Sequence, residues 1–125
     1  MKYFTLEELT ATTTGIKNVP TKAQASNLIA LVENVLDPVR TLLGRPITVN
    51  SGYRNQMVNE KVKGAKTSQH LKGEAADLNC ENNKRLFILI RDHFTFDQLI
   101  DEYNYKWIHV SFSQVHNRNQ ILSIT

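Results

Sequence analysis

One stretch near the middle of the chain combines metal-binding side chains with the residues of a tight loop: Ser68-Gln69-His70-Leu71-Lys72-Gly73-Glu74-Ala75-Ala76-Asp77. His70 and Asp77 can both bind zinc, through an imidazole nitrogen and a carboxylate oxygen. They lie seven residues apart with Gly73 between them, so a loop can fold back and bring both side chains to one ion. The two alanines before Asp77 are small enough for the chain to pass close to such a site.

A catalytic zinc site needs a third protein ligand, and the apolar segment 107–112 contains the best candidate, His109. In a strand, successive side chains point to opposite faces. One face then carries Trp107, His109 and Ser111, and the other carries Ile108, Val110 and Phe112. The first face suits a site and the second suits a hydrophobic core.

Local signals mark where the helices begin. Thr5 with Glu8 and Thr21 with Gln24 have the spacing of a capping box, in which each side chain bonds the backbone of the other residue. The second box opens a long amphipathic helix, and Pro38 is expected to kink that helix.

The flanking segments predict an α+β fold with helices packed on one face of a small antiparallel sheet. Gly44 is a typical residue at a helix end. We expect helices at 5–11, 21–43, 55–62 and 82–93, and strands at 47–49, 74–78, 96–100, 107–112 and 120–124. The length of 125 residues suits a single domain, residues 1–125, with one core.

The composition is that of a globular protein with a weak positive charge of +3. The basic residues are scattered, with one loose cluster at Lys61, Lys63 and Lys66, so we do not expect nucleic-acid binding. An anionic polymer such as bacterial cell wall is compatible with this charge. The single cysteine, Cys80, is expected to be a buried structural residue. We find neither a signal peptide nor a membrane-spanning segment.

Three segments together resemble the zinc D-Ala-D-Ala carboxypeptidases and related phage endolysin peptidases: SQHLKGEAADL at 68–78, SGYRN at 51–55 and WIHVSF at 107–112. The family pattern S-x-H-x-x-G-x-A-x-D is matched at every fixed position, namely Ser68, His70, Gly73, Ala75 and Asp77. The resemblance runs from about Phe4 to Ser113 and is strongest to the compact single-domain branch. It implies a fold like that of hedgehog and D,D-peptidase domains.

The resemblance also implies one zinc ion per chain, with three ligands: His70, Asp77 and His109. Arg54 is similar to the family arginine that contacts substrate and stabilises the developing oxyanion. A structural ion pair is the alternative role for this arginine. Other side chains are expected to contact the substrate: Ser68, Gln69 and Trp107.

The general base is where the chain departs from many relatives, which carry an acid three residues before the last histidine. That position is Lys106 here, and an ammonium group cannot accept the proton of an attacking water. In the compact branch an acid follows the FDQLI segment, which lies at 96–100 in this chain. Glu102 matches that acid best, and Asp101 is the alternative.

We therefore expect a zinc peptidase that cuts stem or cross-bridge peptides of peptidoglycan, as a D-Ala-D-Ala carboxypeptidase or an endopeptidase. An alternative is a zinc-containing module that binds cell wall without turnover, which Lys106 favours. A purely structural zinc is disfavoured because structural sites normally have four ligands. We expect a monomer that is made in the cytoplasm and acts at the periplasm or cell wall, as a phage or prophage lysin does.

Overall fold

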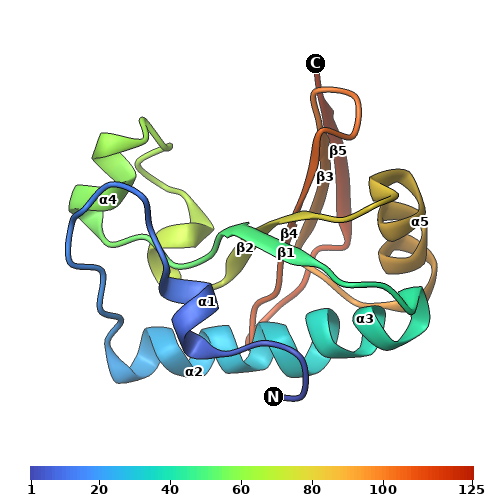
Figure 1. Ribbon diagram of the computed structural model, residues 1–125, viewed down its shortest axis with the longest axis horizontal. Helices are drawn as coiled ribbons and strands as arrows, with labels where there is room; N and C mark the ends of the chain where they lie inside the picture. Colours follow the sequence, from blue (N-terminus) through green and yellow to red (C-terminus); the bar gives the residue numbers. More distant parts are fainter.

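The computed structural model describes residues 1–125, and its helices pack against a five-stranded sheet, which confirms the α+β prediction (Figure 1). The helices are α1 (Leu6–Thr10), α2 (Lys22–Leu31), α3 (Asp37–Leu43), α4 (Gln56–Lys61) and α5 (Asn83–His93). A π-helical turn, η1 (Val32–Leu36), joins α2 to α3, and η2 (Gln69–Lys72) is a 3-10 turn. The strands are β1 (Thr48–Ser51), β2 (Ala75–Asn79), β3 (Gln98–Glu102), β4 (Trp107–Ser111) and β5 (Gln120–Ile124).

Both predicted capping boxes are present, at the starts of α1 and α2. The segment from α2 through η1 to α3 is one continuous helical run, as expected, but its irregular turn η1 ends two residues before Pro38. In a regular α-helix the proline ring clashes with the carbonyl four residues earlier, and a wider π turn relieves that clash. Gly44 ends the run with φ 68°.

The sheet has the order β1-β2-β4-β3-β5 and is mixed, so the expectation of an antiparallel sheet is wrong for one strand pair. β1, β2, β4 and β3 pair antiparallel, whereas β5 pairs parallel with β3. The chain turns back after β4 and crosses to the far side of β3, where β5 pairs with β3. β5 therefore runs opposite to β4 and in the same direction as β3.

One face of the sheet packs against the core, and it is the face that alternation predicted for Ile108 and Val110. Leu99 of β3 and Ile108 and Val110 of β4 are fully buried in one cluster with side chains of α2, η1, α3 and α5. α2 and α3 run along one side of the molecule, and α4 lies at the opposite end from α5 (Figure 1). No helix is long and apolar enough to cross a membrane.

Candidate metal centre

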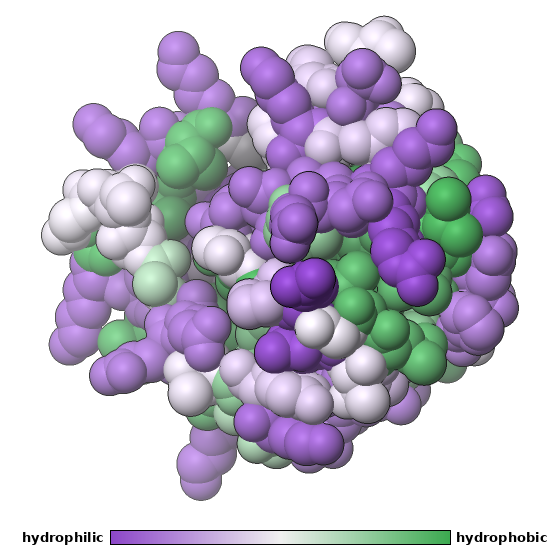
Figure 2. All heavy atoms as spheres, turned by 45° about the vertical axis from the view of Figure 1, so that its right-hand side comes forward, coloured by the Kyte–Doolittle hydropathy of each residue, from purple (hydrophilic) through white to green (hydrophobic).

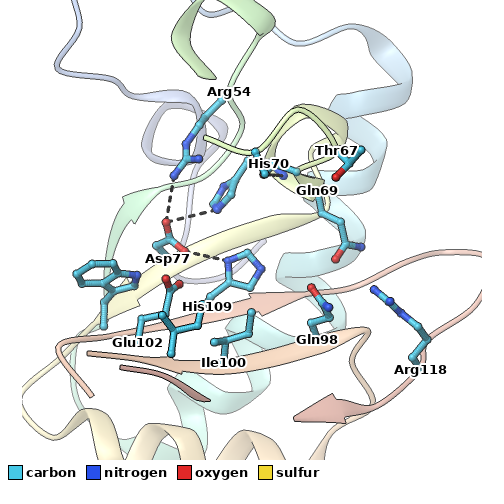
Figure 3. Close-up of a pocket in the computed structure, with 14 residues that line it drawn as sticks. Arg54, Thr67, Gln69, His70, Asp77, Gln98, Ile100, Glu102, His109 and Arg118 are labelled. Atoms are coloured by element: carbon cyan, nitrogen blue, oxygen red, sulfur yellow. Dashed lines mark hydrogen bonds and ion pairs between the residues drawn. The ribbon is translucent and has the colours of Figure 1, made fainter. Parts of the chain in front are cut away.

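Two side chains from one short stretch of the chain and a third from a distant strand meet on the face of the sheet opposite the core (Figure 3). They are the predicted ligands: His70 of η2, Asp77 of β2 and His109 of β4. One ligand atom from each lies within 4.8 Å of the other two, and no other cluster of histidine, cysteine and acidic side chains has this arrangement. Two imidazoles and a carboxylate form a donor set that suits zinc.

The β2–β4 ladder fixes two of these three side chains. Asp77 and His109 are direct cross-strand partners, so their side chains leave the sheet on the same face. His109 Nδ1 lies 3.0 Å from Asp77 Oδ1. Both residues are largely buried, with 13% of the Asp77 side chain and 9% of His109 exposed.

The turn η2 positions His70. The Ser68 hydroxyl accepts a hydrogen bond from the His70 backbone N–H and caps the turn. The Gly52 carbonyl lies 2.6 Å from His70 Nδ1 and accepts its hydrogen bond, which leaves Nε2 with a free lone pair. Nε2 faces Asp77 Oδ2 at 3.4 Å, so its lone pair points toward the centre of the cluster.

Gly73 ends the turn in the left-handed conformation, with φ 75°. A Cβ at this position would clash with the backbone carbonyl of Gln24 in α2. The close approach of η2 to α2 therefore requires glycine, and it brings His70 back toward the sheet.

Asp77 carries a negative charge at neutral pH. Burial raises the pKa of its carboxyl, but its interactions with the His109 and His70 imidazoles outweigh burial and hold that pKa well below its ordinary value. The cluster thus offers an ionised carboxylate beside two imidazoles, which is an electrostatic environment that attracts a cation.

Arg54 lies against the same carboxylate, in the loop between β1 and α4. Its Nη2 is 3.2 Å from Asp77 Oδ2, its Nε donates to Ser51 Oγ at 2.9 Å and its Nη1 donates to Asn59 Oδ1 at 3.4 Å. The side chain is only 15% exposed. The ion pair that was the alternative role for Arg54 is therefore present, and the guanidinium also lines the cleft beside the cluster.

A cleft of about 540 Å³ opens over the cluster. All three residues expected to contact substrate line it, namely Ser68, Gln69 and Trp107. Glu102 lies on one side of the cluster, and Gln69, Gln98 and Arg118 lie on the other side (Figure 3).

The two candidate general bases lie on opposite faces of β3. Glu102 pairs with Trp107 across the ladder, lines the cleft and points toward Asp77 and His109 (Figure 3). Asp101 is 9% exposed and accepts a hydrogen bond from Ser123 Oγ at 2.9 Å, away from the cleft. Lys106 does not line the cleft. The geometry therefore supports Glu102 over Asp101.

Sequence reasoning missed three polar residues of the cleft, namely Thr67, Gln98 and Arg118. Gln98 is four residues before Glu102 on β3. Once the strand is known to reach Glu102, alternation places both side chains on the same face of the sheet. Arg118 comes from the loop between β4 and β5 and has no local sequence signal. Its position depends on a contact with Asp97, at 2.8 Å for both Nε–Oδ1 and Nη2–Oδ2.

Comparisons with known proteins agree with the site. The family model of Peptidase M15 matches residues 2–111. A zinc D-Ala-D-Ala carboxypeptidase of Streptomyces albus G is 36% identical over 77 residues, which cover 61% of this chain. The matched region spans 29% of that relative, so the chain resembles less than a third of its length. Arg118 and Ile124, which both line the cleft, lie beyond the residues that the family model matches.

Proposed function

The chain belongs to the Peptidase M15 family, and from this premise we propose that it is a zinc metallopeptidase that hydrolyses stem or cross-bridge peptides of peptidoglycan. The observation that carries the proposal is the meeting of His70, Asp77 and His109 in a cleft that also holds Glu102. The name of the Streptomyces relative, a zinc D-Ala-D-Ala carboxypeptidase, supports both the metal and the substrate class.

We propose one zinc ion per chain, bound by the two imidazoles and the carboxylate of the cluster. Three protein ligands are the number that a catalytic zinc site uses, because its remaining position stays open. When bound there, zinc supplies Lewis acidity toward a peptide carbonyl and lowers the pKa of water. Gly52 supports this assignment, because its carbonyl holds the His70 tautomer whose free nitrogen faces the cluster.

Glu102 is the proposed general base. Its carboxylate accepts a proton from the attacking water and then delivers that proton to the leaving amine. Its position on the cleft wall, beside Trp107 and directed at the cluster, supports this role (Figure 3). Asp101 has the same chemistry but lies on the other face of β3.

Arg54 is the proposed electrostatic partner of the oxyanion that develops when the carbonyl is attacked. Its bonds to Ser51, Asn59 and Asp77 hold the guanidinium in place before substrate binds. A preorganised positive charge of this kind needs no rearrangement during the reaction. Ser68, Gln69 and Trp107 are proposed to contact the peptide, because they line the same cleft.

Digestion of purified Gram-negative-type peptidoglycan tests the proposal, with released fragments identified by mass spectrometry. We expect release that stops with a chelator and returns with zinc. Glu102→Gln should lower kcat by roughly 10²–10⁴-fold, whereas Asp101→Asn should change it only a few-fold. The fragment masses identify the bond that is cut and distinguish a carboxypeptidase from an endopeptidase. Cleavage that survives in Glu102→Gln would remove this residue from the mechanism.

The competing proposal is a cell-wall binding module without turnover, which the presence of Lys106 favours. It predicts co-sedimentation of the zinc-loaded protein with peptidoglycan and no fragments at any time. We further propose that the active protein is a monomer and acts at the cell wall in the manner of a lysin. Sedimentation of the zinc-loaded protein tests its oligomeric state.

A further inference from the structure

The cleft extends beyond the metal ligands to a polar wall made by Gln69 of η2, Gln98 of β3 and Arg118 of the β4–β5 loop (Figure 3). This wall lies on the opposite side of the cluster from Glu102. None of its three residues is needed to hold the metal or to move a proton in the proposed reaction.

The Arg118 guanidinium is fixed on one edge and free on the other. Its Nε and Nη2 contact the Asp97 carboxylate, which is only 5% exposed, and the Arg118 backbone N–H also donates to Asp97 Oδ1. Nη1 donates to no acceptor in the protein, and half of the side chain is exposed. The edge formed by Nη1 and the second N–H of Nη2 is therefore available to a second carboxylate, which arginine binds in a two-point geometry.

The two glutamines add polar groups to this wall. Gln69 Oε1 is buried and is the one buried side-chain oxygen or nitrogen without a hydrogen-bond partner. Gln98 Nε2 donates to Gln120 Oε1 at 2.7 Å, which leaves the carbonyl oxygen of Gln98 free. A peptide can satisfy the exposed part of this wall, because it offers an N–H group to Gln98 and a carboxylate to Arg118.

The sheet register sets the distance of this wall from the reacting bond. Ile100 is the cross-strand partner of His109, and Gln98 lies two residues before Ile100, at the start of β3. At about 3.4 Å per residue, Gln98 is about 7 Å from the level of His109. An extended peptide advances about 3.5 Å per residue, so the wall faces the second residue from the scissile bond. Glu102, which is proposed to protonate the leaving amine, lies on the other side of the cluster. The second substrate residue that faces the wall therefore belongs to the acyl portion of the peptide.

We propose that Arg118, with Gln69 and Gln98, forms a subsite for a carboxylate carried by the second residue on the acyl side of the scissile bond. This inference rests on the proposed peptidase function and makes it more specific. It assigns a specificity role to a residue outside the part of the chain that the family model matches.

Direct binding of two synthetic peptides tests the subsite: acetyl-Glu-D-Ala-D-Ala and its uncharged analogue acetyl-Gln-D-Ala-D-Ala. The zinc-loaded Glu102→Gln protein is used, so that turnover does not interfere with the calorimetric Kd. We expect the glutamate peptide to bind about fivefold more tightly, because an arginine fork gains from the charge while solvent and Asp97 weaken the attraction. Adding Arg118→Gln should bring the Kd ratio close to one.

Arg45→Gln is the matched control, since it removes the same charge at an exposed position outside the cleft and should keep the ratio. Arg118→Lys should keep part of the preference. Equal Kd values for the two peptides before Arg118 is changed would overturn the subsite and leave the peptidase proposal standing. Equal weakening of both peptides by Arg118→Gln would reduce Arg118 to a structural partner of Asp97. Failure of both peptides to bind would overturn the subsite together with the proposed substrate.

Discussion

Asp77 is the residue on which the other side chains of the centre converge. One of its oxygens contacts His109, and the other contacts both His70 and Arg54. A single buried carboxylate thus orients both imidazoles and balances the charge of the arginine. Its charge is the feature that makes the cluster selective for a cation.

Asp77→Asn should lower the affinity for zinc by roughly 100-fold or more, since it removes a charged ligand and not merely a supporting contact. Competition with a zinc-binding dye measures this affinity without any activity assay. Asp92→Asn, a change to an exposed acid paired with Arg91, is the control and should bind zinc as the parent protein does. Unchanged affinity in Asp77→Asn would place the metal elsewhere.

Among the structural elements, the short turn η2 has the strictest requirement on its sequence. It carries His70 and ends at Gly73, where both the positive φ and the contact with α2 exclude a side chain. Gly44, at the end of α3, has nearly the same φ but open space around it. Replacing each glycine by alanine therefore separates the free-energy cost of a left-handed backbone from the free-energy cost of a steric clash.

Gly44→Ala should destabilise the protein by about 1 kcal/mol, which is the cost of a left-handed alanine. Gly73→Ala should cost about 2–4 kcal/mol, because the added methyl group also meets the Gln24 carbonyl and the turn must shift. Urea unfolding measures both changes. Only Gly73→Ala should also weaken zinc binding, since only this turn holds a ligand. Equal stability losses in the two variants would mean that α2 and η2 separate easily.

The contact of Asp97 with Arg118 joins β3 to the loop before β5, and it depends on pH. Hydrogen bonds from Arg118 lower the pKa of Asp97 to about 2, against about 3.9 in an unfolded chain. A carboxyl with a lowered folded-state pKa stabilises the protein above the unfolded value, and this contribution disappears as the pH falls toward 2. Asp97→Asn should therefore cost about 1 kcal/mol at pH 7 and much less at pH 2.5.

Denaturant unfolding of the parent and Asp97→Asn proteins at pH 7, 4 and 2.5 checks this dependence. The difference in the free energy of unfolding should be constant at high pH and should shrink between pH 4 and pH 2.5. A difference that grows as the solution is acidified would contradict the direction of the pKa shift.

Local sequence signals were sufficient for some elements and insufficient for others. The capping boxes that begin α1 and α2 were predictable because both partners lie within one turn. The parallel pairing of β5 was not, because it depends on where the loop after β4 returns to the sheet. The choice between Asp101 and Glu102 needed the true end of β3: the expected strand stopped at Ile100, before either acid.

The surface of the whole molecule leaves β5 uncovered. All five of its residues are exposed, including Ile121, Leu122 and Ile124. Figure 2 brings the side with α5 and β5 forward and shows apolar side chains grouped within a mostly hydrophilic surface. β5 therefore contributes little to the core, and the stability of the fold depends on β1 to β4 and the helices that cover them.

The metal centre joins the neighbouring segments η2 and β2 to β4, which lies about 30 residues further along the chain. These segments separate on unfolding, so the complete ligand set exists only in the folded state and zinc should stabilise the protein by mass action. At a free zinc concentration about 100 times Kd, the gain is about 2.7 kcal/mol, which corresponds to a rise in Tm of roughly 10 °C for a chain of this size. Scanning calorimetry with and without zinc measures the rise.

His109→Ala is the variant that decides whether this stabilisation comes from the proposed centre. It removes one ligand on β4 and should abolish most of the zinc-dependent rise in Tm, whatever its own effect on the metal-free protein. His116→Ala, a change to an exposed histidine outside the cleft, is the matched control and should keep the full rise. A rise in His109→Ala equal to that of the parent would show that zinc stabilises the fold through other residues, and the cluster would then lose its role as the metal site.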